Sequence, residues 1–215
     1  MVTVLQKILL FCSAWIVIVP VLICILFYRN YNAGLKVLGI HVFIACAVEL
    51  SSYLLMKLGR NNLPLLHFYT LSEFVLLYIY YDLFFHNTFP KWLLRGLAGC
   101  FVLFTLINSI FVQSIYTFNN YARALEALLL IILALLCFYK LYLPVQTTGA
   151  THHSVVWINS GILLYFSGAF TLFILSNYIL PLGKTLNTRI WAVHSFLSIL
   201  LYVFISIGLW RERKP

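Results

Sequence analysis

The stretch from Ile8 to Tyr28 reads ILLFCSAWIVIVPVLICILFY and contains no charged side chain. A run of about 20 apolar residues is long enough to cross the hydrocarbon core of a bilayer as an α-helix. A lone β-strand could not do so, because lipid offers no hydrogen-bond partner to its backbone. The stretch is too long for the apolar part of a signal peptide and lacks a clear cleavage site of small residues. We therefore expect it to be a transmembrane helix.

Apolar stretches of the same kind fill the rest of the chain, separated by short polar connections. The predicted spans are residues 8–28, 34–57, 63–85, 91–115, 121–143, 154–179 and 187–210. Neither a low-complexity tract nor a soluble domain is visible between them. The sequence thus predicts an all-α, polytopic membrane protein in which residues 1–215 form a single bundle of seven transmembrane helices.

The composition supports the same class of protein. Hydrophobic residues make up 63% of the chain and charged residues 9%, whereas a soluble domain usually carries about 25% charge. A formal net charge of +9 would suggest nucleic acid as the partner of a soluble protein. Here the basic residues lie in short connections and at the C-terminus, where they suit phospholipid head groups. Membrane lipids are therefore the predicted partners, and nucleic acid is not.

Lys and Arg are distributed unevenly between the two ends of the predicted bundle. The odd-numbered connections and the C-terminus carry eight of them, while the N-terminus and the even-numbered connections carry six. Positively charged loops tend to stay on the cytoplasmic side. We therefore expect a multi-pass protein of the cell membrane, such as a bacterial inner membrane, with its N-terminus outside and its C-terminus inside.

Ionisable and polar side chains gather in one half of the predicted bundle. At a rise of 1.5 Å per residue, Glu49 lies roughly 12 Å and Glu73 roughly 15 Å below the N-terminal face. Such groups are unfavourable in hydrocarbon unless they are paired or hydrated, so we expect one shared cavity open to that face. The candidate ligand-binding residues are Glu49, Tyr53, His67, Tyr69, Glu73, Arg123, Glu126, Asn177 and His194. The opposite half is expected to offer only His41, Asp82 and Asn159.

Glu49 and Glu73 are the strongest candidates in this set. As a pair they could bind a cation, share a proton or act as acid and base. Alternatively, each carboxyl group hydrogen-bonds a Tyr or Ser and holds two helices together. Arg123 and Glu126 are three residues apart, a spacing that suits a local ion pair near a helix start. Arg123 could instead face the cavity and meet an anionic group of a ligand.

His67 and His194 could add proton carriers or metal ligands to the cavity. No His spacing in the chain matches a local metal signature such as H-E-x-x-H, and the five cysteines include no C-x-x-C pair. A hydrogen-bonded structural role is the alternative for each His. The sequence therefore predicts no metal and no cofactor.

Small residues follow one side of the sixth predicted span. They are Ser160, Gly161, Ser167, Gly168 and Thr171. Small side chains allow two helices to approach closely in a membrane, so we expect a tightly packed neighbour on this side.

Two segments of the chain carry a family resemblance. Residues 61–74 read NNLPLLHFYTLSEF, and residues 190–202 read IWAVHSFLSILLY. They resemble a bacterial seven-helix membrane family that is similar to the sensor module of some seven-helix histidine kinases. The resemblance implies a receptor-like bundle over the whole chain. The positions that it marks are Asn62, His67, Tyr69, Glu73 and His194.

These observations favour a receptor-like or sensory protein that binds a small ligand, a cation or a proton in the polar cavity. No kinase domain follows Trp210, so a sensor of this kind would need a separate signalling or membrane-complex subunit. The less favoured alternatives are an intramembrane enzyme that uses carboxylate and His chemistry on a lipid-like substrate, and a structural subunit of a membrane complex. A transport pathway would require polar residues to continue through the other half of the bundle.

Overall fold

A computed structural model describes residues 4–86, 88–143, 150–179, 181 and 183–213. Its helices are α1 (Val4–Trp15), α2 (Ile18–Phe27), η1 (Tyr28–Asn30), α3 (Ala33–Lys57), α4 (Leu63–Phe85), α5 (Lys91–Ile107), η2 (Asn108–Val112), α6 (Asn120–Tyr142), α7 (Ala150–Ile179) and α8 (Lys184–Arg211). They form 7 spans that are long and apolar enough to cross a membrane. The predicted all-α, seven-helix membrane bundle is therefore confirmed.

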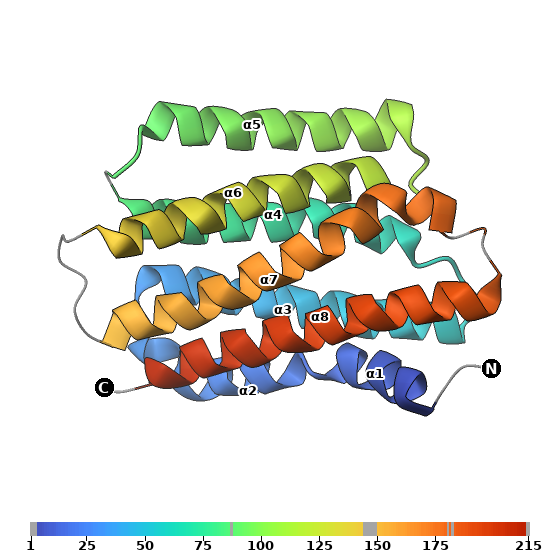
Figure 1. Cartoon of the computed structure of the whole chain (residues 1–215), viewed down its shortest axis with the longest axis horizontal. Helices are drawn as coiled ribbons and strands as arrows, with labels where there is room; N and C mark the ends of the chain where they lie inside the picture. Colours follow the sequence, from blue (N-terminus) through green and yellow to red (C-terminus); the bar gives the residue numbers. More distant parts are fainter. Residues whose placement is uncertain (1–3, 87, 144–149, 180, 182, 214–215) are drawn as a thin grey trace.

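The first span is broken in the middle, where the sequence predicted one continuous helix over 8–28. Proline has no N–H to donate and its ring clashes with the carbonyl group four residues earlier. In this span the residue four positions before Pro20 is Ile16. The Ile16 carbonyl group accepts a hydrogen bond from Val19 N, only three residues later, at 3.1 Å. The chain therefore forms two helices, α1 and α2, with a bend between them that is visible in Figure 1.

The fourth span also departs from a regular helix. It was predicted to continue to residue 115, but α5 ends at Ile107 and is followed by the π-helical turn η2. Gln113 N closes this turn by donating to Asn108 O at 2.7 Å. The wider turn places the side chains of Asn108 and Gln113 on the connection to α6, where they enter a hydrogen-bond network described below.

Six of the seven spans close a ring. The ring consists, in order, of the first span, α3, α4, α6, α7 and α8. It is closed because α8 packs against both α1 and α2 of the first span. The helix α5 lies outside the ring against α4 and α6. Figure 1 shows α5 along one edge of the bundle and α1 and α2 along the opposite edge, with the two termini at opposite ends of the long axis.

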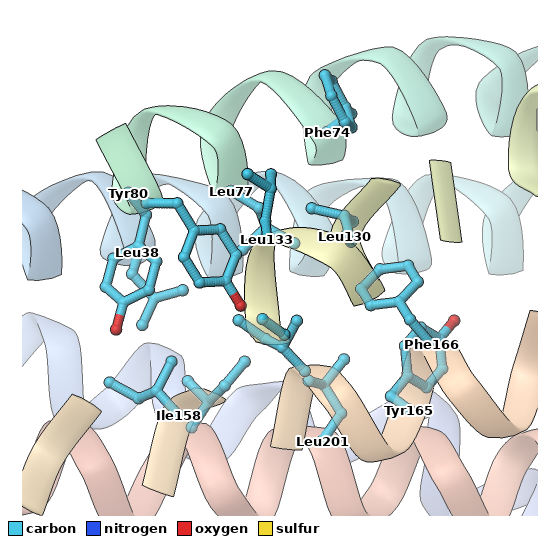
Figure 2. Packing of buried hydrophobic residues seen from close by; sticks show 14 of the residues in the cluster. Leu38, Phe74, Leu77, Tyr80, Leu130, Leu133, Ile158, Tyr165, Phe166 and Leu201 are labelled. Atoms are coloured by element: carbon cyan, nitrogen blue, oxygen red, sulfur yellow. The ribbon is translucent and has the colours of Figure 1, made fainter. Parts of the chain in front are cut away.

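Apolar side chains fill the half of the ring nearer the C-terminus. Figure 2 shows Leu38, Tyr80, Leu133 and Ile158 converging there from α3, α4, α6 and α7. All of them are buried. Close packing of this kind leaves little room for water or a ligand among these side chains. Beyond them, at the C-terminal end of the bundle, lies a cavity of about 310 Å³ whose polar lining residues include Asn32, Lys140, Ser154 and Glu212.

Several polar groups of this packed half are hydrogen-bonded, although the Tyr80 hydroxyl has no partner among the described residues. The Tyr81 hydroxyl donates to Asn159 Oδ1 at 2.7 Å, and Asn159 Nδ2 donates to Ala134 O at 3.0 Å. Asn159 thereby ties α4, α6 and α7 together. Lys140 Nζ donates to the carbonyl groups of Phe84 and Phe85, which stabilises the C-terminal end of α4.

The close packing expected on one side of the sixth predicted span is present between α7 and α8. A Cβ atom built on Gly161 would lie 2.7 Å from Phe204 Cβ, and one built on Gly168 would lie 2.7 Å from Leu197 Cδ1. Ser167 and Thr171 are exposed. The two glycines therefore allow α8 to approach α7 closely.

Candidate functional site: a polar cavity at the N-terminal end of the ring

The ring encloses a cavity of about 380 Å³ in the half nearer the N-terminus. Every span of the ring contributes to its lining. The lining extends from Glu73 and Tyr202, near the middle of α4 and α8, to Asn62 and Phe118 in the connections before α4 and before α6. Figure 1 shows both connections at the same end of the bundle as the N-terminus. The cavity therefore reaches that end, and it shares no lining residue with the cavity at the C-terminal end.

Arg123 and Glu73 line the inner wall of the cavity, and Glu126 pairs with Arg123 outside the lining. Arg123 Nη1 donates to Glu73 Oε2 at 2.5 Å and to Glu126 Oε2 at 2.7 Å. The side chains of Arg123, Glu73 and Glu126 are only 4%, 2% and 0% exposed. Buried charges are tolerated when they are paired and hydrogen-bonded. We call these three residues the carboxylate–guanidinium cluster.

Aromatic rings hold the Arg123 guanidinium in place. Its Cζ atom lies 4.5 Å from the centre of the Phe173 ring and 5.8 Å from that of Tyr69, distances at which a cation is attracted to the ring face. The Tyr69 hydroxyl also donates to Glu73 Oε1 at 2.8 Å. Both oxygens of Glu73 therefore accept hydrogen bonds from the protein itself.

A second polar chain leads from Arg123 to α8. Arg123 Nη2 donates to the Tyr165 hydroxyl oxygen at 3.3 Å, and that hydroxyl lies 3.1 Å from His194 Nε2. Since the Tyr165 oxygen accepts from Arg123, its own proton can be directed to His194, which then carries its proton on Nδ1. Tyr165 and His194 thus connect the carboxylate–guanidinium cluster of α4 and α6 to α7 and α8.

His41 lies beside the carboxylate–guanidinium cluster, although its sequence position suggested the opposite half. His41 Nε2 lies 3.9 Å from Glu73 Oε1, and neither ring nitrogen has a hydrogen-bond partner among the described residues. Helical rise places His41 roughly 12 Å from one face and Glu73 roughly 15 Å from the other. Both residues are therefore near the middle of a bilayer about 30 Å thick.

Glu49 differs from Glu73 in its surroundings. It lines the cavity from α3 and is exposed. No hydrogen bond or ion pair joins its carboxylate to another residue of the described part of the chain. Glu49 is therefore the carboxylate that remains available to a ligand.

Four of the candidate residues lie away from the cavity lining, and one of them, Glu126, still bonds to the lining residue Arg123. Tyr53 packs against Trp15 at 5.9 Å between ring centres on the outer side of α3. His67 contacts Ser109 Oγ at 2.9 Å and Thr117 O at 3.2 Å, so that it fastens the connection between α5 and α6.

Asn177 enters an amide network on the same connection. Its Nδ2 atom donates to Asn120 Oδ1 at 2.9 Å, and Gln113 Nε2 donates to the same oxygen. Asn108 Nδ2 donates to Gln113 Oε1 and to Asn119 Oδ1, each at 3.0 Å. This network joins the end of α7 to the π-helical turn and the start of α6.

The structure thus brings together six of the nine candidate residues. They are Glu49, Tyr69, Glu73, Arg123, Glu126 and His194. Sequence reasoning did not select Tyr165 and Tyr202, which also line the cavity. Tyr202 stood on a polar stripe of the last span, but no pattern in the sequence distinguishes Tyr165 from the many other aromatic residues.

The fold and the site define a multi-pass α-helical membrane protein with a polar cavity at one end. Comparisons with known proteins found no matching family model, no matching curated protein and no matching solved structure. Among the described residues, no three His, Cys, Asp or Glu side chains are placed to hold a metal ion together.

Proposed function

We propose that this chain is a receptor-like membrane protein that binds a small cationic ligand in the cavity at its N-terminal end. The contrast between its two central carboxylates carries the proposal. Glu73 is buried and fully engaged by Arg123 and Tyr69, whereas Glu49 lines the same cavity with no hydrogen-bond or ion-pair partner among the described residues. A free carboxylate at membrane depth is costly unless water or a cation compensates it.

The charges around the cavity favour a cation over an anion. Three carboxyl groups, those of Glu49, Glu73 and Glu126, accompany the single guanidinium of Arg123. That guanidinium is occupied by two of the carboxylates and by Tyr165. The remaining donor, Arg123 Nε, has no partner among the described residues but is buried. An anionic ligand would therefore have to displace one of these contacts, while a cation needs only the exposed Glu49 carboxylate.

A sensory role accounts for a cavity that reaches only one end of the bundle. A ligand that enters and leaves by the same side does not require a path through the packed half. With the N-terminus outside, as the distribution of Lys and Arg favours, the cavity would face the exterior of the cell. The signal would pass to a separate membrane or signalling subunit, in keeping with the family resemblance.

Ligand-dependent thermal stabilisation tests the proposal. The protein is reconstituted in phosphatidylcholine nanodiscs, and its unfolding is followed by Trp fluorescence with butylamine, butanol or butyrate as the probe. Because a ligand that binds only the folded state raises Tm, butylamine should raise Tm and the neutral and anionic probes should not.

Glu49→Gln should abolish the response to butylamine, because it removes the charge and keeps the size of the side chain. Asp82→Asn is the matched control, since Asp82 lies near the far end of α4 and lines neither this cavity nor the one at the C-terminal end. An equal butylamine response of the Glu49→Gln variant and the wild type would refute the proposal, as would a wild type that responds equally to all three probes.

A further inference from the structure

A groove on the outside of the bundle runs beside the cavity. It has a volume of about 150 Å³ and lies between the first span and α3. Its lining is apolar apart from Glu49 and the Tyr53 hydroxyl, and it includes Trp15, Ile18 and Leu50, which are 39%, 37% and 51% exposed. Because both walls of the groove are transmembrane spans, these exposed side chains meet lipid chains.

The groove lies beside the bend in the first span. The helix α2 packs against α3 and α8, while α1 packs against α8. The groove lies at the bend, with Ala14 and Trp15 from the end of α1 and Val17 and Ile18 from the break and the start of α2. The broken helix at Pro20 therefore has a structural consequence at the surface of the ring.

The groove and the cavity share two residues. Ala14 and Glu49 line both of them. Ala14 is small, and the Glu49 carboxylate lies where the apolar groove meets the polar cavity. A ligand placed at this junction would present a cationic group to Glu49 and could leave an apolar chain in the groove.

We infer that the ligand is a cationic amphiphile with a single alkyl chain, which reaches the cavity from the bilayer between the first span and α3. This inference deepens the proposed function and rests on it. The amine head group binds Glu49, and the alkyl chain lies against Cys46, Leu50 and Ile18 in the groove. An anionic or neutral amphiphile lacks the charge that Glu49 requires.

The binding of radiolabelled decylamine and butylamine to the protein in phosphatidylcholine nanodiscs tests this inference, with empty nanodiscs as the background. Cys46→Phe fills the groove without touching the cavity, since Cys46 lines only the groove. Cys100→Phe is the matched control, because Cys100 is exposed on α5 at the other edge of the bundle.

Cys46→Phe should lower the affinity for decylamine about tenfold, as expected when about two methylene groups lose their contacts. The affinity for butylamine should stay within about twofold of that of the wild type. Retained butylamine binding also shows that the variant is folded. Cys100→Phe should change neither affinity. Glu49→Gln should weaken both amines, and decanoate should not compete with decylamine.

The result separates the two proposals. If butylamine binding depends on Glu49 but Cys46→Phe binds decylamine like the wild type, the route from the bilayer is wrong and the cation site stands. If decanoate competes as well as unlabelled decylamine, the cationic head group is wrong. If neither amine depends on Glu49, the proposed function itself is wrong.

Discussion

Arg123 is the side chain on which the polar interior of this protein depends. It lies near the start of α6 and donates to carboxylates from α4 and α6 while it stacks on Phe173 of α7. Removing one partner from a buried charged pair leaves the other charges uncompensated. The contribution of Arg123 is therefore best measured together with that of the two carboxylates.

We predict that Arg123→Met destabilises the protein by about 3 kcal/mol, because Glu73 and Glu126 are then buried without their cation. Equilibrium unfolding in detergent micelles measures the loss. The triple variant Arg123→Met, Glu73→Gln, Glu126→Gln should recover most of it, since neutral amides need no counter-charge. A triple variant as unstable as Arg123→Met would mean that the packing of Arg123, not its charge, is what matters.

At this scale the sequence predicted part of the cavity. The depth of Glu49, Glu73 and His194 along their spans was enough to place them together, because helical rise fixes depth. Depth does not fix which way a side chain points around the helix, so His67 could not be separated from the cavity residues. It bonds instead to Ser109 and Thr117, which lie in a connection whose path no periodic pattern specifies.

Glycines mark a close approach of the helices α7 and α8. Gly161 and Gly168 of α7 face Phe204 and Leu197, and Gly208 of α8 faces Ile158. The Ser154 hydroxyl also donates to Gly208 O at 2.7 Å. Because α8 carries His194 and α7 carries Tyr165, the spacing of these two helices sets one side of the cavity.

Gly161→Leu should therefore destabilise the bundle by about 1–3 kcal/mol, the usual range for an overpacked interior. Gly99→Leu on α5 is the matched control, because nothing lies within 4 Å of a Cβ atom at that position. Unfolding midpoints of the two variants in the same micelles provide the comparison. Equal midpoints would contradict the close approach of α7 and α8.

Element boundaries were predicted well where hydrophobic runs end in turn residues. The third predicted span, 63–85, coincides with α4, which carries Pro64 in its first turn. The two departures have local causes. Pro20 breaks the first span, and the hydrogen bonds of Asn108 and Gln113 favour the π-helical turn after α5. Apolar composition specifies a helix but not these local interruptions.

The whole molecule has a cavity of about 380 Å³ at its N-terminal end and one of about 310 Å³ at its C-terminal end, with closely packed apolar side chains between them. The number of spans follows from the apolar runs, because each must satisfy its backbone hydrogen bonds within the bilayer. The order of the spans around the ring and the position of α5 outside it could not be predicted, since apolar faces are alike to lipid and to neighbouring helices. The proposed function requires that water fills the cavity and that the cavity reaches the N-terminal end.

Thiol labelling measures whether water reaches the cavity from the N-terminal side. In a variant without the native cysteines, Ser198→Cys and Ile205→Cys place one thiol each on α8, two turns apart on a similar face. Ser198 lines the cavity, and Ile205 is 0% exposed in the packed half. Val193→Cys provides a lipid-facing control, since Val193 is 55% exposed on the same helix.

A charged, membrane-impermeant thiol reagent is added to the N-terminal side of oriented vesicles, and the rate of modification is measured for each variant. We predict that Ser198→Cys reacts much faster than Ile205→Cys and Val193→Cys, because only its thiol meets water through the cavity. A Ser198→Cys thiol that reacts no faster than that of Ile205→Cys would contradict the account.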